Sequence, residues 1–375
     1  MSKKAMVAMS GGVDSSVAAS ILLDQGFEVC GVTLKLFSNS DIDITDSSRT
    51  CCSLEDVEDA RRVAYKLGFE HYVFNFGTYF QNTVMERFVS EYLDGRTPNP
   101  CIDCNRFIKF GKLIDRADLM GQDYIATGHY ARIKYNTETG RYELLKAKDR
   151  SKDQTYVLYS LTQSELSRTL LPLGDMLKSE VREYAQHHGL VNAEKPDSQD
   201  ICFVSDGDYA RFIEFTTGKK SEPGDFVDTE GNVLGRHKGI IHYTIGQRRG
   251  IGISFNGRKY VVDKDAKTNT VVLGDETDLY KNGFIADNVN WISIEQLNEP
   301  MAVAVKTRYS QIEAPATIYS GKNGIVSVVF DEPQRAVTPG QAAVFYDGDK
   351  VVGGGTILKS TDFDFTRRIA TPTRK

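Results

Sequence analysis

Roughly the first two hundred residues alternate short apolar runs with longer stretches of helical periodicity. Ala5 to Met9 and Glu28 to Leu36 are predicted strands on either side of a predicted helix from Val13 to Leu23. Further expected helices span 54–67, 79–93 and 105–120, and further buried strands span 72–76 and 123–127. Strands that alternate with helices are typical of a parallel sheet covered by helices, so we predict an α/β N-terminal domain.

From about Ser205 the pattern changes to short Val, Ile and Tyr runs separated by turn-forming Gly, Asn and Asp residues. This texture predicts two smaller β-rich domains, with a break near Asn282 and Gly283 and a barrel-like last part. We therefore expect three domains, at residues 1–207, 208–283 and 284–375.

Composition narrows the class of protein. The 375 residues are 40% hydrophobic and carry a net charge of -5, which excludes a generally basic nucleic-acid coat. No apolar stretch approaches the roughly 20 residues that span a bilayer, so we expect a cytoplasmic protein with no membrane partner. Six cysteines are too few for a disulfide framework and are expected to be thiols.

The segment SGGVDSS, residues 10–16, lies where the first strand meets the first helix. Backbone N–H groups at a helix N-terminus favour phosphate, Gly11 and Gly12 allow its close approach, and Asp14 could hold a magnesium ion that bridges phosphate oxygens. The alternative is a Gly–Gly turn with a helix cap. The loop lacks the Gly-Lys-Ser/Thr ending of a Walker loop, and it resembles the PP-loop of the ATP pyrophosphatases, which split ATP into AMP and pyrophosphate.

Two loops carry candidate thiol chemistry. In TPNPCIDCN, residues 97–105, prolines brace Cys101 and Cys104, and Cys104 is expected near a helix N-terminus, which favours the thiolate. The alternative, half of a zinc site, lacks a second ligand pair in the sequence. Cys202 follows the polar run DSQD, which indicates a reactive thiol in a loop, although an isolated cysteine is more often a buried apolar residue. Cys30, Cys51 and Cys52 fit no motif.

Eight segments occur in order over nearly the whole chain: SGGVDSS, TPNPCIDCNRFIKF, DYIATGHYAR, SKDQTYVLY, DSQDICF, HYTIGQRRGIGI, VKTRYSQ and VTPGQAAVFY. Together they resemble the tRNA-specific 2-thiouridylase family, whose members place sulfur on C2 of the wobble uridine of certain tRNA anticodons. The resemblance implies a fold of the adenine nucleotide α-hydrolase, PP-loop type for the first domain.

The resemblance also implies roles for individual residues. It makes Cys104 the nucleophile and Cys202 the cysteine that carries a persulfide. It implies ATP contacts at Ala8, Met9, Ser10, Gly11, Gly12, Val13, Asp14, Ser15, Leu34 and Gly128. It implies tRNA contacts at Asn99, Pro100, Cys101, His129, Lys152, Asp153, Gln154, Arg308, Tyr309 and Gln341. Two positions depart from the pattern, since Cys101 replaces an aspartate and Leu34 replaces a methionine. From the residues alone, His129 is as well explained as a buried histidine of the core.

The implied partners are tRNA, ATP with magnesium, and a persulfide sulfur donor such as a cysteine desulfurase or a sulfur carrier protein. Two alternatives stay open. An iron–sulfur cluster on Cys101, Cys104 and Cys202 could carry the sulfur instead. The chain could also be a PP-loop synthetase that acts on a small molecule.

One segment is basic despite the net negative charge. Residues 231–262 hold six Lys or Arg and no Asp or Glu. Such a run is usually an ordinary solvated face, but the absence of any acidic residue in a net-acidic chain favours contact with RNA phosphates.

Overall fold

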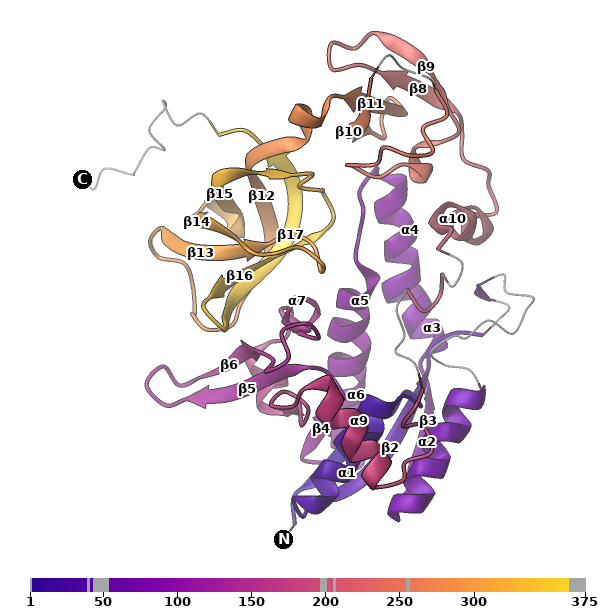
Figure 1. The fold of residues 1–375 in the computed structure, drawn as a ribbon, viewed down its shortest axis with the longest axis vertical. Helices are drawn as coiled ribbons and strands as arrows, with labels where there is room; N and C mark the ends of the chain where they lie inside the picture. Colours follow the sequence, from indigo (N-terminus) through magenta and orange to yellow (C-terminus); the bar gives the residue numbers. More distant parts are fainter. Residues whose placement is uncertain are drawn as a thin grey trace.

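The computed structural model describes residues 2–38, 41–42, 54–195, 201–204, 207–253 and 257–363. Three sheets organise them, and Figure 1 shows the N-terminal sheet with its helices at one end, a small sheet at the other and a barrel to the side. Within the described residues, no helix is both long enough and apolar enough to cross a membrane.

The N-terminal sheet is parallel, with the order β3-β2-β1-β4-β7. Its strands are β1 (Lys4–Ala8), β2 (Glu28–Lys35), β3 (His71–Asn75), β4 (Tyr124–Ala126) and β7 (Thr169–Leu170). Both faces of β1 are buried, because Met6 packs into one hydrophobic core while Ala5 and Val7 pack into another. The predicted α/β domain is thus confirmed.

The helices α1 (Val13–Asp24) and α2 (Leu54–Leu67) pack on this sheet, and α9 (Lys178–His187) packs on α1. Two short helices, α7 (Thr155–Leu158) and α8 (Gln163–Ser167), also belong to this part of the chain. Two longer runs each contain a π-helical turn: α3 (Gly77–Phe80), η2 (Gln81–Met85) and α4 (Glu86–Leu93) form the first, and α5 (Pro100–Asp103), η3 (Cys104–Lys112) and α6 (Leu113–Leu119) form the second. Each expected helix of this part of the chain is present.

The strand order changes direction beside β1. The chain passes from β1 to β2 and β3 on one side and returns to β4 on the other, so the sheet has its switch point between β1 and β4. In open parallel sheets, ligands bind outside the carboxyl ends of the strands at such a point.

The middle of the chain forms a four-stranded sheet with the order β10-β11-β8-β9. Its elements are β8 (Gly224–Val227), β9 (Val233–His237), η4 (Ile240–His242), β10 (Tyr260–Asp265), β11 (Thr270–Gly274) and η5 (Glu276–Leu279). A helix, α10 (Tyr209–Thr217), precedes it, in a region that the sequence pattern predicted to be mostly β. Its signals were present: Asp208 caps its start, Phe212 and Ile213 are buried on one side, and Gly218 ends it in the left-handed conformation.

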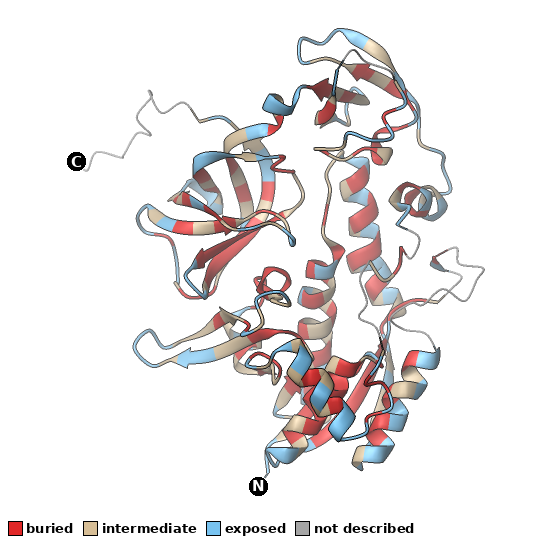
Figure 2. Ribbon diagram, viewed as in Figure 1, coloured by how far each residue is buried: buried red, intermediate tan, exposed pale blue. Residues whose placement is uncertain are grey.

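The last part is a closed barrel of six strands, because β12 pairs with both β15 and β17. Its elements are β12 (Tyr280–Trp291), β13 (Met301–Lys306), β14 (Ala314–Ser320), η6 (Lys322–Gly324), β15 (Val326–Arg335), β16 (Ala342–Asp347) and β17 (Lys350–Thr361). Figure 2 shows buried residues along the barrel strands and along α4 and α5. Asn282 and Gly283, where the sequence suggested a break, lie inside β12.

A hairpin from the N-terminal part joins the barrel sheet. It consists of β5 (Ala131–Asn136) and β6 (Arg141–Lys146), and Leu145 of β6 pairs with Lys350 of β17. The Arg141 guanidinium also donates to the Ile292 carbonyl at 2.9 Å. The barrel is therefore attached to the α/β part by main-chain pairing as well as by side chains.

Candidate active site

The SGGVDSS loop connects β1 to α1 at the switch point. Gly11 has a φ of +72°, and a Cβ there would lie 2.4 Å from the Asp56 carbonyl oxygen, so only glycine fits. The Ser15 and Ser16 hydroxyls each donate to the Gly12 carbonyl at 3.1 Å. The loop is thus held against the first turn of α1, where helix N–H groups favour an anion.

The other expected ATP residues lie at the same edge of the sheet. Leu34 is buried near the carboxyl end of β2. Gly128 follows β4, and a Cβ there would come within 2.7 Å of the Asp14 carbonyl carbon and the Ser15 nitrogen. The fold therefore brings residues 8–15, Leu34 and Gly128 to one edge of the sheet.

Asp14 is engaged by two side chains from distant elements. Lys178 of α9 donates to both carboxylate oxygens, at 2.7 and 2.8 Å, and the Tyr130 hydroxyl donates to one of them at 2.8 Å. These neighbours are hydrogen-bond donors and a cation, which is not the donor set of a metal ion. The residues around Asp14 thus do not fit a magnesium site in this arrangement.

The first cysteine loop opens the long helical run from Pro100 to Leu119. The Asn99 side chain caps it by accepting from the Cys101 N–H at 3.1 Å, and Pro100 occupies the first helical position. Cys101 is exposed and Cys104 is half-buried, three residues apart on one side of the helix. This confirms the expected helix start at the cysteines.

Between the two cysteines lies a buried carboxyl group, Asp103. Burial raises the pKa of Asp103 to about 6, an effect that the nearby Arg87 and Arg106 guanidinium groups oppose. The Arg87 Nε lies 3.4 Å from its carboxylate.

The second cysteine loop is anchored by its aromatic neighbour. Phe203 is 2% exposed, and its ring centroid lies within 6 Å of those of Phe80, Phe88 and Phe212. Cys202 itself is half-buried, outside any strand or helix, and packs against the same hydrophobic core as Cys104. The preceding DSQD run, residues 197–200, and Cys51 and Cys52 lie outside the described residues.

The three cysteines that an iron–sulfur cluster would use, Cys101, Cys104 and Cys202, lie within the described residues. Among the described residues, no three His, Cys, Asp or Glu side chains are grouped so that they could hold a metal ion. The arrangement therefore lends no support to the cluster alternative.

Most of the expected tRNA residues gather where the barrel meets the α/β part. The Gln341 side chain donates to the Thr97 carbonyl at 2.7 Å, and the Thr97 N–H donates to the Pro339 carbonyl at 2.9 Å, which ties the barrel to the loop before the cysteines. Tyr309 lies 6.1 Å from the Tyr156 ring, and burial, together with the charges of Asp153 and Cys101, raises the pKa of Tyr309.

Several of the expected tRNA-contacting side chains form hydrogen bonds within the protein. Arg308 donates to the carbonyls of Ile245 and Ala336 and thereby links the barrel to the segment between η4 and β10. Gln154 accepts from the Tyr130 N–H at 2.8 Å. Lys152, Asp153 and Gln154 precede α7, which packs against the barrel through the Tyr156 hydroxyl and the Ala342 carbonyl at 2.9 Å.

His129 is 9% exposed and belongs to the interior. Its Nδ1 lies 2.7 Å from the Thr127 hydroxyl, and its ring lies 5.8 Å from that of Phe110. Burial lowers the pKa of His129 well below its ordinary value, so the ring is neutral near pH 7. This burial agrees with the alternative that His129 is a histidine of the core.

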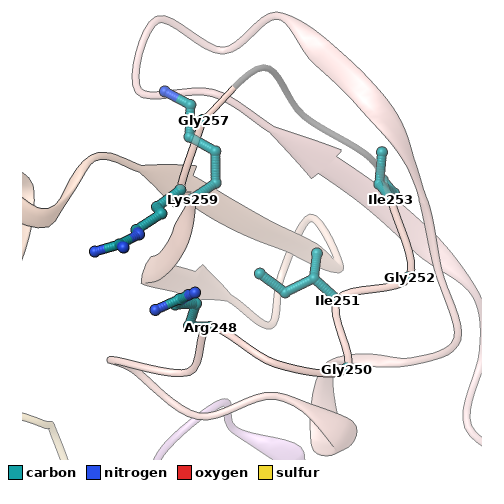
Figure 3. A pocket seen from close by; sticks show the side chains of 8 residues that line it. Arg248, Gly250, Ile251, Gly252, Ile253, Gly257 and Lys259 are labelled. Atoms are coloured by element: carbon teal, nitrogen blue, oxygen red, sulfur yellow. The ribbon is translucent and has the colours of Figure 1, made fainter.

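Some of the cations in the basic segment, residues 231–262, form ion pairs. Arg236 pairs with Asp225 at 2.9 Å and Lys259 pairs with Asp275 at 3.0 Å, so the fold brings acidic groups from outside the segment to it. Arg248, Arg258 and Lys259 nevertheless line an open pocket of about 260 Å³. Figure 3 shows Arg248, Ile251 and Ile253 along one loop, with Lys259 beside it.

Two residues that contact the SGGVDSS loop were not predicted from the sequence. Lys178 contacts Asp14, and the Asn192 amide donates to the Gly11 carbonyl at 3.0 Å and to the Ser16 hydroxyl at 2.8 Å. Neither residue lies in a motif near residues 10–16, and only the fold brings them there.

The parallel sheet, the loop at its switch point and the β-rich parts that follow define a PP-loop type of nucleotide-binding enzyme. Family models match as tRNA methyl transferase HUP domain over residues 3–206, tRNA methyl transferase PRC-barrel domain over 210–275 and aminomethyltransferase beta-barrel domain over 281–357. The chain belongs to the tRNA-specific 2-thiouridylase family.

Curated relatives establish this membership. The chain is 56% identical to the tRNA-specific 2-thiouridylase MnmA of Acetivibrio thermocellus, over 95% of this chain and 99% of that protein. It is 54% identical to the protein of the same name from Clostridioides difficile, over 96% of this chain and 99% of that protein. The family models are described as methyl transferase domains, whereas these relatives are named for thiolation, the chemistry that the resemblance of the eight ordered segments implied.

Proposed function

We propose that the chain is an ATP-dependent tRNA-uridine 2-sulfurtransferase that acts on the wobble uridine. The observation that carries the proposal is the combination of 56% identity to a 2-thiouridylase with two cysteine loops built on a PP-loop scaffold. ATP, tRNA and a sulfur-donor protein would be its partners.

ATP is needed because the C2 carbonyl of uridine is urea-like and has no leaving group. The uridine O2 attacks the α-phosphate of ATP, pyrophosphate leaves, and O2 becomes part of an AMP leaving group. The residues 10–16 and the first turn of α1 would hold the phosphates and stabilise the charge on the leaving pyrophosphate. Magnesium would arrive with ATP as part of the substrate.

Sulfur then comes from a persulfide on Cys202, which a cysteine desulfurase or a sulfur carrier protein would load. The Cys104 thiolate attacks the inner sulfur of that persulfide, so a Cys104–Cys202 disulfide forms and the outer sulfur leaves as hydrosulfide with the electron pair. Hydrosulfide attacks C2, and AMP departs with the former O2. An external thiol reductant reopens the disulfide for the next cycle.

The junction of the barrel with the α/β part would receive the anticodon loop. Single-stranded loop bases can be splayed out and held in a pocket, which a reaction at C2 requires. Asn99, Pro100 and Cys101 at the start of the cysteine helix and Tyr309 on the barrel would contact the RNA there.

The test is thiolation of tRNA by variants of single cysteines. Cys104→Ser and Cys202→Ser should each abolish 2-thiouridine formation while ATP binding is retained, because each removes one sulfur of the relay. Cys30→Ala is the matched control: Cys30 is buried on β2, burial raises its pKa to about 11, and it should be dispensable. Substantial thiouridine from either serine variant would refute the roles of Cys104 and Cys202.

The alternatives give different outcomes in the same assay. A small-molecule synthetase would incorporate no sulfur into tRNA with ATP, with or without a persulfide donor. A cluster-dependent enzyme would be brown when purified without oxygen, with about four irons per chain, and a colourless preparation with full activity would exclude it.

A further inference from the structure

A half-buried cation, Lys306, lies at the junction of the barrel with the α/β part. Lys306 is the last residue of β13, and its side chain reaches across to α7. Its ammonium nitrogen lies 5.6 Å from the ring centroid of Tyr309, on the loop after β13, and 6.0 Å from that of Tyr156 on α7. Tyr156 is fully buried and Tyr309 is 43% exposed, so the ammonium group lies at the edge of the interior.

The two rings attract this cation through their faces, but such contacts leave its N–H donors without an acceptor. Within the described residues, Lys306 forms no ion pair and donates no hydrogen bond. The two carboxylates whose charges act on it are engaged elsewhere, since Glu313 pairs with Lys146 at 2.6 Å and Asp153 accepts from the Ala147 N–H at 2.9 Å. The ammonium group therefore has donors to offer to a ligand.

The surroundings of Lys306 suit an anion. Burial lowers the pKa of Lys306 because it disfavours the charged form, so a negative group beside the ammonium would be stabilised more than in open water. A compact ammonium group commonly binds phosphate. Tyr309 is close enough to Cys101 for the charge of that thiol to raise the pKa of Tyr309. The ammonium group thus lies one aromatic ring away from the start of the cysteine helix.

We infer that Lys306 binds a phosphate group of the tRNA anticodon loop. This inference rests on the proposed function. It adds a charged contact to a junction whose other expected RNA-contacting residues, Asn99, Pro100 and Tyr309, carry no charge, and where Arg308 is engaged with main-chain carbonyls.

The first test measures binding of tRNA with a wobble uridine to the full-length protein by fluorescence anisotropy. Lys306→Met, which keeps the apolar length of the side chain, should weaken binding about tenfold, because hydrogen bonds to charged groups are among the stronger ones. The slope of log K against log salt should fall by roughly 0.7, the value for one phosphate of a single strand. Lys281→Met is the matched control, because Lys281 lies on the same barrel and already pairs with Asp362 at 2.8 Å. Lys306→Arg should recover part of the loss.

Neutral phosphates separate a direct contact from a structural role. In a series of tRNAs assembled by ligation, one phosphate of the anticodon loop at a time is replaced by an uncharged methylphosphonate. At the position that Lys306 contacts, the replacement should weaken binding to the wild-type protein about tenfold, and Lys306→Met should cost nothing further with that tRNA alone.

An equal cost of Lys306→Met with every tRNA of the series would overturn the inference, and so would wild-type affinity and salt slope in Lys306→Met. If Lys306→Met fails to fold, as judged by circular dichroism, Lys306→Gln replaces it in both experiments. Failure of the wild-type protein to bind the unmodified tRNA would instead refute the proposed function.

Discussion

At the scale of single residues, Asp103 makes stability depend on pH. Its folded pKa of about 6 lies above the ordinary value of 3.8 because burial disfavours the charged form. The folded protein therefore binds more protons than the unfolded chain between about pH 4 and pH 6, and stability falls as pH rises through this window.

Asp103→Asn should remove this contribution. The variant should gain up to about 3 kcal/mol relative to wild type at pH 7 and nearly nothing at pH 4, since each pKa unit is worth about 1.4 kcal/mol. Urea unfolding of both proteins at the two pH values measures the difference. An equal effect of the substitution at both would contradict the burial of an ionisable carboxyl group there.

A second residue-scale prediction concerns Gly128. A Cβ at this position would lie 2.7 Å from main-chain atoms of Asp14 and Ser15, so Gly128→Ala must displace the phosphate loop. We expect KM for ATP to rise about tenfold or more, equivalent to about 1.4 kcal/mol of lost binding. Gly121→Ala is the control, because a Cβ there meets nothing within 4 Å and its φ of +63° adds only local strain. Equal KM values for the two variants would show that Gly128 does not support the site.

At the scale of elements, the barrel positions the loop that carries the cysteines. Gly340 has a φ of +89°, and a Cβ there would lie 2.8 Å from the Thr97 nitrogen. Gly340→Ala should therefore part the barrel from this loop and lower thiolation about tenfold or more, an effect of about 1.4 kcal/mol, with nucleotide binding unchanged.

Gly348→Ala is the matched control for the barrel. Gly348 also has a positive φ, of +58°, but a Cβ there meets nothing within 4 Å. The Gly348→Ala variant has the backbone strain of the substitution but no clash with Thr97. It should therefore thiolate tRNA nearly as well as the wild-type protein. Loss of activity in both variants alike would mean that backbone strain, and not docking, limits the reaction.

The elements also show what the sequence can predict. The loop between β1 and α1 was predictable because its signal is local, with Gly11 and Gly12 between an apolar run and a helix. The start of the cysteine helix was predictable for the same reason. The helix α10 was missed although Asp208 and Gly218 mark its ends.

Long-range contacts were out of reach of the sequence pattern. Lys178 and Asn192 meet the phosphate loop only after the sheet has formed, across 164 and 181 residues. The pairing of β6 with β17 is of the same kind, since Leu145 meets Lys350 only where the hairpin joins the barrel sheet and not through any local motif. The role of each residue at such contacts depends on packing that no single-sequence pattern encodes.

At the scale of the whole molecule, the charge distribution bears on tRNA binding. The acid-free run of residues 231–262 loses part of its charge to Asp225 and Asp275, which approach it only in the fold. Among the described residues, no ion pair involves Arg248 or Arg258, and both line the pocket of Figure 3. These two are therefore the stronger candidates for contact with the RNA backbone.

Salt dependence tests this assignment. Arg248→Ala and Arg258→Ala should each weaken tRNA binding and reduce the slope of log K against log salt by roughly 0.7 to 0.9, the effect of one lost phosphate contact. Arg236→Ala, which removes a cation already paired with Asp225, should change the slope less. Filter binding over a series of salt concentrations gives the slopes. Identical slopes for all three variants and the wild type would place the RNA elsewhere on the molecule.

Passage of sulfur from Cys202 to tRNA at the expense of ATP can be measured directly. The protein is loaded with a labelled persulfide sulfur, separated from the donor, and mixed with tRNA and ATP in a single turnover. We expect labelled 2-thiouridine in tRNA, AMP and pyrophosphate in equal amounts, and one disulfide between Cys104 and Cys202 by peptide mass spectrometry. Label that stays on the protein, or that reaches tRNA without ATP, would contradict it.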